Sequence, residues 1–373
     1  MKLITLQKDY KMLLKDTITE YLSPNLVYLP IKDDFKLLVN PKDIIFKGQK
    51  IYDLKYSPIS GNIIGIKELN NRKYLVINND FKEKKCKKVL KKINEISKIE
   101  LLEIIKNYNL KIYNKININA NRIIINAIEE QPYVGNKKFI CKFFNKEILY
   151  ILDLLCHTLD IKDIQINFKD TDLMGISNIN NIIGMYPNIN IKLLPNKYLI
   201  SNKSILSKYL NINEEFIYLE VEDLYNLYDY FENKKIMEEK LITITGNAIN
   251  NPQVIKCKIG TCLKDILDEV VEFNNENYII MSNNLLGNKI CNNNIIIDEE
   301  IDSIFIMNNT DVIEKECIRC GKCNEYCPVN INVYNLVNNK KCDKEDCIDC
   351  GLCTYICPSY ININKYLGGD YHE

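Results

Sequence analysis

Short apolar runs separated by polar turns occupy the early part of the chain. Within residues 26–80, runs of four to six residues are broken at Lys-Gly, Ser-Gly and Asn-Asp pairs. Such runs predict short β-strands joined by tight turns. We expect a small antiparallel barrel or sandwich in this region.

A longer periodic segment follows, over residues 84–110. Lysines separate apolar residues that recur at helical spacing, and the apolar set is Val89, Ile93, Ile96, Leu101, Ile104 and Ile105. This spacing predicts a helix or a helix pair with a solvated lysine face, ending near Leu110.

Strands and helices alternate over residues 123–200. The β-branched runs are RIIINA, DIQINF and INIKLL, and the amphipathic segment KEILYILDLLCHTLD stands between the first two. This alternation predicts a parallel sheet with crossover helices. His157 lies inside the amphipathic segment, where we expect it to pack against a neighbouring element.

Residues 242–290 form one more small unit in the pattern. A strand, an Asn-Asn-Pro turn, a second strand and a helix are expected in that order. Thr261 immediately precedes the apolar positions of the expected helix, so it is the predicted N-cap.

The charge balance and the length of the chain exclude several classes of function. The chain has 373 residues, which predicts two or three domains on length alone, and 49 basic residues balance 49 acidic ones. A neutral chain lacks the basic footprint of a nucleic-acid-binding protein or a polybasic membrane anchor. Lys8, Asp9 and Lys11 interrupt any apolar core of a signal peptide, and no apolar stretch reaches the roughly 18 residues of a spanning helix. We therefore expect a cytoplasmic protein without a membrane span.

Fifteen cysteines need an explanation other than disulfides, because the cytosol is reducing. Six are scattered without ligand spacing and are expected to be buried free thiols: Cys86, Cys141, Cys156, Cys257, Cys262 and Cys291. The other nine lie between residues 317 and 357.

Two segments near the C-terminus repeat one cysteine spacing. Residues 317–328 read CIRCGKCNEYCP and residues 347–358 read CIDCGLCTYICP. Both follow C-x2-C-x2-C-x3-C-P, the bacterial ferredoxin run, in which the fourth cysteine binds the other cluster. The first [4Fe–4S] cluster is therefore assigned Cys317, Cys320, Cys323 and Cys357. The second is assigned Cys347, Cys350, Cys353 and Cys327.

Glycine follows the second cysteine of each run, at Gly321 and Gly351. Without a Cβ, the backbone can turn closely around a cluster sulfide. A pair of zinc knuckles is the alternative, because C-x2-C pairs also bind zinc, but it leaves the doubled C-x3-C-P unexplained. Cys342 fits neither run, and we expect it to be structural. The alternative is that it substitutes as a ligand, but its spacing to Cys347 does not fit the pattern.

The order of these parts resembles the RnfC family, a component of the Rnf ferredoxin:NAD oxidoreductase, over nearly the whole chain. The likeness is carried by KGQKI, SPISG, IIINAIEEQPY, TGNAINNPQVIKCKIGTCLKDIL and the two cysteine runs. The resemblance implies an α+β multidomain protein of four units: an N-terminal barrel-sandwich domain (1–82), a central α/β domain with a parallel sheet (83–240), a β-grasp module of the soluble-ligand-binding type (241–310) and a dicluster ferredoxin-type domain (311–373).

One part of the family pattern is missing. Before the INGxExEPY strand the family carries a glycine-rich loop, similar to the loop that holds flavin mononucleotide and admits NADH in the flavin-binding component of respiratory complex I. Here no glycine lies between residues 65 and 135, and the family's ECEPY has become EEQPY at residues 129–133. We therefore expect no flavin mononucleotide at the usual place. The residues alone leave open whether Asn126, Glu129 and Glu130 contact a ligand or form a turn.

Three functions fit these observations. The first is an iron–sulfur electron-transfer subunit of an Rnf-type complex in an anaerobe. It would work with a ferredoxin, a flavoprotein or membrane Rnf subunits, which would hold it on the inner face of the cell membrane. The second is a soluble electron-transfer partner of a dedicated reductase, as in proteins associated with proline reductase. The third is a scaffold with structural clusters and no turnover. Neither of the first two functions requires a catalytic residue in this chain. We also do not expect the chain to have its own NADH site.

Overall fold

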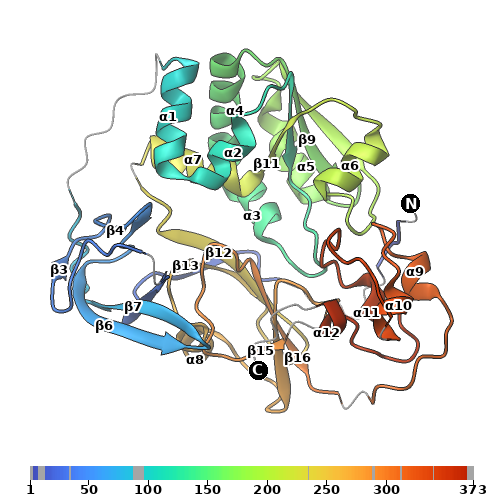
Figure 1. The fold of residues 1–373 in the computed structure, drawn as a ribbon. Coiled ribbons are helices and arrows are strands. Elements are labelled where there is room, and N and C mark those ends of the chain that lie inside the picture. The colour runs from blue at the N-terminus through green and yellow to red at the C-terminus, as the bar shows by residue number, and fades with distance from the viewer. Residues whose placement is uncertain are drawn as a thin grey trace.

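The computed structural model describes residues 3–6, 13–32, 35–86, 96–233, 235–287, 290–310, 313–338 and 340–367. Figure 1 shows an α/β layer at the top, β-sheets below it, and the C-terminal unit at one side. The chain is thus a mixed α/β protein with several sheets.

The first unit is an antiparallel β-structure. It contains a four-stranded sheet in the order β2-β7-β6-β3 and a two-stranded ribbon β4-β5. Their bounds are β2 (Leu26–Ile31), β3 (Ile44–Ile45), β4 (Lys50–Tyr52), β5 (Lys55–Tyr56), β6 (Gly61–Leu69) and β7 (Arg72–Asn79). The strands enclose a small apolar core that includes Val27, Ile45 and Ile77. The short antiparallel strands expected from the sequence are present, and the name barrel-sandwich stays a prediction.

The second unit contains the parallel sheet that the alternating pattern predicts. All four strands pair in parallel in the order β10-β9-β8-β11. Their bounds are β8 (Arg122–Asn126), β9 (Asp163–Lys169), β10 (Ile189–Leu194) and β11 (Ile217–Glu220). Ile123 and Ile125 pack into the larger apolar core on one face, and Ile124 packs into a separate core on the other. Both faces are therefore covered, which explains why this strand is apolar at every central position.

Helices cover both faces of this sheet (Figure 1). They are α1 (Lys98–Tyr108), α2 (Leu110–Ile116), α3 (Asn136–Phe143), α4 (Asn145–Leu159), α5 (Leu173–Ile183), α6 (Lys203–Leu210) and α7 (Val221–Phe231). The helix expected over residues 84–110 begins only at Lys98, where Ser97 and Glu100 form a capping box. Val89 and Ile93 lie outside the described residues. Helix α1 ends at Tyr108, close to the expected end near Leu110. Asn109 then caps a second helix, α2, which the sequence pattern did not predict.

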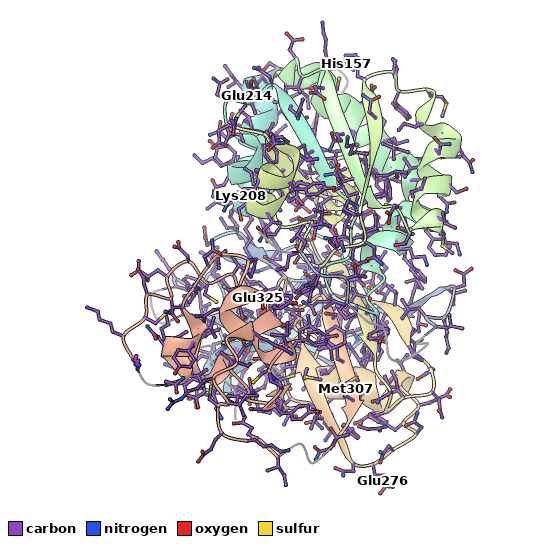
Figure 2. All side chains as sticks on the ribbon, turned by 90° about the vertical axis from the view of Figure 1, so that its right-hand side faces the viewer. His157, Lys208, Glu214, Glu276, Met307 and Glu325 are labelled. Atoms are coloured by element: carbon purple, nitrogen blue, oxygen red, sulfur yellow. The ribbon has the colours of Figure 1, made fainter. Side chains whose placement is uncertain are left out.

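His157 does not pack against a neighbouring element. Its side chain is 74% exposed at the end of α4, with Nε2 3.5 Å from Asp153 Oδ1, and Figure 2 shows it on the outer surface. The periodic pattern placed it in the correct helix, but its position on that helix turns it toward solvent.

The third unit is a six-stranded mixed sheet in the order β1-β13-β12-β16-β14-β15. Its elements are β1 (Ile18–Tyr21), β12 (Glu239–Thr245), β13 (Gln253–Lys258), α8 (Leu263–Val270), β14 (Tyr278–Ser282), β15 (Ile290–Cys291) and β16 (Ser303–Asn308). Strand β1 belongs to the range expected for the first domain, yet it pairs in parallel with β13. The four domain boundaries stay predictions.

The N-cap expected at Thr261 is displaced by one residue. Helix α8 is capped by Cys262, without a side-chain hydrogen bond. The backbone of Thr261 is engaged elsewhere, because its carbonyl oxygen accepts a hydrogen bond from Ile297 N across 2.9 Å.

Two buried ion pairs lie at the boundary between the first and third units, and the pair of Lys47 with Glu238 crosses it. Lys258, whose side chain is 1% exposed, lies 2.6 Å from Glu239 Oε1. Lys47, from the first unit, lies 3.4 Å from Glu238 Oε2. Charges this deeply buried are tolerated only when they are paired, so the two units are held in a fixed relation. Within the described ranges, no helix combines the length and apolar character needed to cross a membrane.

Candidate iron–sulfur centres and the adjoining charged cavity

The C-terminal unit consists of two copies of one local structure. In the first, Gly321 precedes the short helix α9 (Lys322–Glu325), and in the second, Gly351 precedes α11 (Leu352–Tyr355). The two glycines have φ of +74° and +73°, a region in which a side chain is strained. The helices that follow the two runs are α10 (Val333–Val337) and α12 (Asn364–Leu367). The repeated spacing in the sequence is therefore a repeated backbone conformation.

One cavity in this unit is lined by cysteines from both copies. Cys317, Cys320 and Cys323 come from the first run, and Cys357 comes from the second. The remaining lining residues are mostly small or apolar: Ile318, Gly321, Tyr334, Val337, Pro358, Ser359, Ile361 and Ile363.

A second cavity repeats this arrangement with the copies exchanged. Cys347, Cys350 and Cys353 come from the second run, and Cys327 comes from the first. The other lining residues are Pro328, Val329, Ile331, Val333, Ile348, Gly351, Leu352 and Leu367. Four thiols in an apolar pocket are the donor set that a [4Fe–4S] cluster needs, so the residues of each cavity fit such a group. Nowhere in the described ranges do three His, Cys, Asp or Glu side chains converge on a single ion position.

The two cysteine sets differ in burial. Cys320 is exposed, whereas Cys353 is 9% exposed. Burial raises the pKa of the Cys353 thiol to about 12 and that of Cys350 to about 11. These thiols are protonated at neutral pH before they bind a metal, so loading of this set releases protons.

The second copy is held against the rest of the protein. The Tyr198 hydroxyl donates a hydrogen bond to the carbonyl oxygen of Cys350 across 2.7 Å, and Asn284 Nδ2 donates to the carbonyl oxygen of Asp349 across 2.6 Å. A Cβ at Gly351 would lie only 2.4 Å from a backbone nitrogen of the loop at residue 287. In Figure 1, α11 and α12 accordingly lie on the inner side of the unit, and α9 lies on its outer side.

Asn126 stands at the carboxyl end of β8, where ligands bind in many open α/β sheets. Its side chain is fully buried. Nδ2 donates to Glu220 Oε2 across 2.7 Å, and Oδ1 accepts from Ile128 N across 2.9 Å. Asn126 therefore ties β8 to the end of β11 and fixes the turn that follows.

Glu129 and Glu130 also have partners within the protein. Glu129 Oε1 accepts a hydrogen bond from Lys137 N across 2.5 Å, in the first turn of α3. Glu130 Oε1 accepts from Ser201 Oγ across 3.0 Å. A carboxylate at a helix N-terminus satisfies backbone N–H groups that have no partner in the helix. The turn interpretation of these residues thus gains direct structural support.

Gln131 connects the sheet edge to two other units. Its Nε2 donates to the Tyr198 hydroxyl across 3.0 Å, and its Oε1 accepts from Leu285 N across 3.2 Å. Because Tyr198 in turn contacts Cys350, Gln131 lies two hydrogen bonds away from a cysteine of the second set. The EEQPY segment therefore connects the parallel sheet, the six-stranded sheet and the C-terminal unit through hydrogen bonds, and we call it the EEQPY joint.

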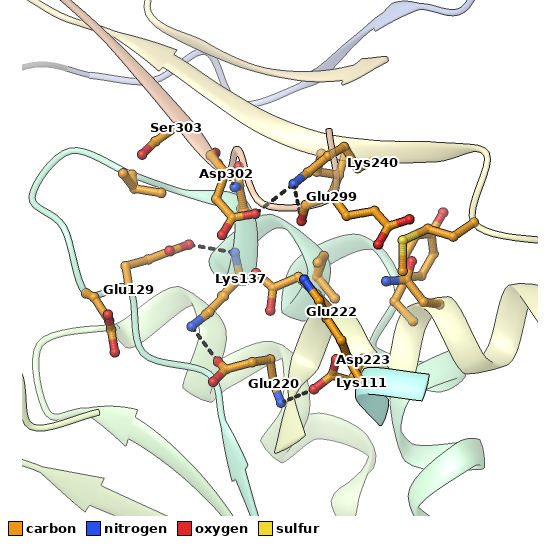
Figure 3. A pocket seen from close by; sticks show the side chains of 18 of the residues that line it. Lys111, Glu129, Lys137, Glu220, Glu222, Asp223, Lys240, Glu299, Asp302 and Ser303 are labelled. Carbon is orange, nitrogen blue, oxygen red and sulfur yellow. Dashed lines mark hydrogen bonds and ion pairs between the residues drawn. The ribbon is translucent and has the colours of Figure 1, made fainter. Parts of the chain in front are cut away.

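A cavity of about 460 Å³ adjoins this joint. Carboxylates outnumber lysines on its walls, and the charged residues are Glu129, Glu130, Glu220, Glu222, Asp223, Glu299, Asp302, Lys111, Lys115, Lys137 and Lys240. Figure 3 shows Lys137 directed toward Glu220, and Lys240 directed toward Asp302. Lys137 Nζ lies 2.6 Å from Glu220 Oε2, and Lys240 Nζ lies 2.9 Å from Asp302 Oδ1.

Burial dominates the electrostatics of this cavity. It raises the pKa of Glu129 to about 7 and raises that of Glu222 well above its ordinary value. Glu222 Oε2 is buried and has no hydrogen-bond partner among the described residues. The cavity can therefore hold or release a proton near neutral pH, whereas its excess of carboxylates disfavours a phosphate group.

Several of these residues carried no signal in the sequence. Tyr198, Asn284 and Lys137 stand outside every motif, because their partners are distant in the chain.

Among the scattered cysteines, the expectation of burial is confirmed for all but Cys86, which is exposed at the end of the first unit. Cys342 lines neither thiol cavity, and its Sγ lies 3.2 Å from the carbonyl oxygen of Asn332.

Comparisons with known proteins agree with the cysteine pattern. The family described as "4Fe-4S dicluster domain" matches residues 310–358. RnfC proteins, each named as a component of an "Ion-translocating oxidoreductase complex", are similar over more than half of the chain. That of Buchnera aphidicola is 26% identical over 57% of this chain and 48% of its own length. That of Edwardsiella ictaluri is 25% identical over 58% of this chain and 30% of its own, and that of Haemophilus influenzae is 25% identical over 56% and 27%.

The chain thus spans half or less of the length of these curated relatives. Among solved structures, an NAD+-reducing [NiFe]-hydrogenase in the H2-reduced state aligns with a TM-score of 0.47 at 9% identity, covering 58% of this chain and 47% of that one. The air-oxidized state of such a hydrogenase aligns with a TM-score of 0.45 at 10% identity, covering 52% and 42%.

Proposed function

We propose that this chain, which carries a 4Fe-4S dicluster domain and is related to the RnfC proteins of ion-translocating oxidoreductase complexes, relays single electrons through two [4Fe–4S] clusters. The observation that carries the proposal is the crossed lining of the two cavities. Each takes three thiols from one run and one from the other, which is the ligand exchange of two-cluster ferredoxins.

The chain's own residues position and shield the two centres. Bound clusters supply the one-electron chemistry. The first would be held by Cys317, Cys320, Cys323 and Cys357, and the second by Cys347, Cys350, Cys353 and Cys327. Burial of the second set lowers its solvent access, and access to solvent is one of the factors that set a cluster's reduction potential.

The proposed role is a relay without its own entry site for NADH. The missing glycines and the carboxylate-rich cavity support this, because neither provides the backbone N–H groups that a flavin phosphate needs. The expected partners are other redox subunits of an oxidoreductase complex, such as a ferredoxin or a flavoprotein. We place the chain in the cytoplasm, peripheral to the cell membrane where partner subunits are embedded in it.

Anaerobic purification followed by metal, sulfide and flavin analysis tests this proposal. We expect about eight irons per chain, equivalent sulfide and no flavin. Potentiometric titration monitored by electron paramagnetic resonance should then show two reducible centres. Bound flavin, or reduction by NADH without an added flavoprotein, contradicts a relay without an entry site. Two centres that stay oxidised throughout the biological range of potentials contradict electron transfer and favour a scaffold.

A further inference from the structure

We propose that the charged cavity beside the EEQPY joint binds a small aliphatic amine, whose ammonium group lies against Glu222. The site is separate from the two thiol cavities, since no cysteine stands among the described residues that line it. The inference goes beyond the proposed relay function and does not depend on it.

Glu222 is the side chain that lacks a partner in this cavity. Helix α7 carries it to the cavity wall, and its Oε2 is buried without a hydrogen-bond partner among the described residues. In Figure 3, no dashed line joins Glu222 to another of the residues drawn. Burying a carboxyl without a hydrogen bond costs free energy. A donor that comes from outside the protein would remove this cost.

The charges around Glu222 identify the missing partner as a cation. Lys137 attracts the carboxylate, whereas Glu220 and Glu129 repel it. Lys137 Nζ already lies 2.6 Å from Glu220 Oε2, and Glu129 accepts its hydrogen bonds from backbone N–H groups at the start of α3. One lysine therefore serves three carboxyl groups. An ammonium group supplies both the positive charge and the N–H donors that this part of the cavity lacks.

The other lysines on the walls are bound elsewhere. Their Nζ atoms lie 2.6 to 2.9 Å from carboxylate oxygens, and the pairs are Lys111 with Glu300, Lys115 with Asp223 and Lys240 with Asp302. Glu299 is paired with Lys55. Lys169 reaches the EEQPY joint, where its Nζ donates to the backbone carbonyl oxygen of Glu129 across 3.1 Å. With these neighbours counted, eight carboxyl groups still face six lysines.

The size and the apolar part of the cavity favour an organic cation over a metal ion. Its volume of about 460 Å³ falls within the range of roughly 300–1,000 Å³ that small-molecule pockets occupy. Apolar side chains share its walls, and they are Ile112, Val134, Ile140, Tyr225, Met237 and Leu241. The methylene groups of an aliphatic chain would bury apolar surface against them. In the described ranges, no three metal-binding side chains converge on one ion position.

The cavity can be reached from solvent. It lies between the parallel-sheet unit, which supplies Glu129 and Glu222, and the six-stranded sheet, which supplies Lys240. The side chains of Lys111 and Asp302, on its walls, are 63% and 65% exposed. A small amine can therefore enter on their side.

Calorimetric titration of the anaerobically purified full chain with 1,4-diaminobutane tests the site. We expect saturable binding of about one molecule per chain at low salt, since one ammonium site is formed at Glu222. Glu222→Gln should weaken the affinity by about tenfold or more, because it removes the charge that the ammonium group pairs with. The variant should fold, since it replaces a buried charge that has no hydrogen bond at Oε2.

The controls separate the ammonium group from other causes of binding. Glu103→Gln makes the same chemical change on an exposed residue of α1, outside the cavity, and should change the affinity by less than about twofold. 1,4-Butanediol has the same chain length without charge and should not bind. Magnesium chloride at equal ionic strength should not displace the diamine. Glu129→Gln, as a second cavity variant, should also weaken binding.

The outcomes distinguish this inference from the proposed function. Equal affinities of the wild type and Glu222→Gln overturn the site, as do equal losses in Glu222→Gln and Glu103→Gln. Binding of the diol, or displacement by magnesium, overturns the assignment to an amine. Iron content and reduction by dithionite are measured on the same samples. If both centres are reduced but the diamine does not bind, the site is wrong and the relay stands. If the diamine binds as expected but neither centre is reduced, the site stands and the relay fails.

Discussion

Tyr198 and Cys350 are joined by a hydrogen bond of 2.7 Å, from the phenol hydroxyl to the backbone carbonyl oxygen. Tyr198 is 3% exposed and accepts a second hydrogen bond, from Gln131 Nε2. This pair connects the edge of the parallel sheet to the second cysteine loop. It makes the EEQPY segment part of the support of a proposed redox centre.

Removing this hydroxyl should weaken the joint. Tyr198→Phe leaves a half-buried carbonyl and a half-buried amide without their partner, so we expect a loss of about 1–2 kcal/mol in the free energy of unfolding. Anaerobic urea unfolding followed by circular dichroism measures it. Tyr209→Phe is the control, since Tyr209 is 44% exposed in α6. Equal stability of the two variants is the result that contradicts a supporting role for Tyr198.

The two repeat glycines form a matched pair for a packing test. Because Gly321 and Gly351 share nearly the same positive φ, alanine introduces similar backbone strain at both. Only Gly351→Ala also forces a Cβ to within 2.4 Å of a neighbouring backbone nitrogen. We expect it to be less stable than Gly321→Ala by about 1–3 kcal/mol, the usual range for overpacking. Denaturant midpoints of the two variants, compared at equal iron content, measure the difference.

Each run's fourth cysteine is assigned to the other run's cluster. This crossed assignment predicts how many clusters a double cysteine variant loses. C317S/C357S should lose one cluster and retain about four irons, because both cysteines line the first cavity. C347S/C357S should lose both clusters, since its two cysteines line different cavities. Uncrossed binding predicts the reverse for both pairs. Iron analysis separates the two assignments, and C342S should retain the full iron content.

Burial of Glu129 predicts a pH dependence of stability. Its pKa is raised from 4.5 to about 7 in the folded protein. Between these values the folded state holds a proton that the unfolded state has released, so stability declines as pH rises through this window. Glu129→Gln keeps an oxygen for Lys137 N and removes the titration. Thermal unfolding midpoints from pH 5 to pH 8 should therefore fall more steeply for the wild type than for the variant. Parallel curves contradict the shift.

Local patterns in the sequence identified the features that depend on neighbours in the chain. The β-branched run before Asn126 predicted a buried strand, because apolar residues at every position suit a sheet covered on both faces. The doubled cysteine run predicted two thiol sets and their crossing, because the spacing reflects the geometry of a cluster. Periodicity failed where the controlling contact was remote, as at Thr261, whose backbone pairs with Ile297 instead of capping a helix.

The sequence by itself thus determined the donor groups on which the proposed chemistry rests: eight cysteines in two runs with ferredoxin spacing, and no glycine-rich loop before the central strand. Only the tertiary structure decided how the two runs differ. One is closed off by Tyr198 and Asn284, and the other is left open beside Arg319. The cysteine spacing is identical in the two runs, which agrees with our proposal that each turns around the same kind of group. Their surroundings differ because contacts between distant segments form only when the units pack together.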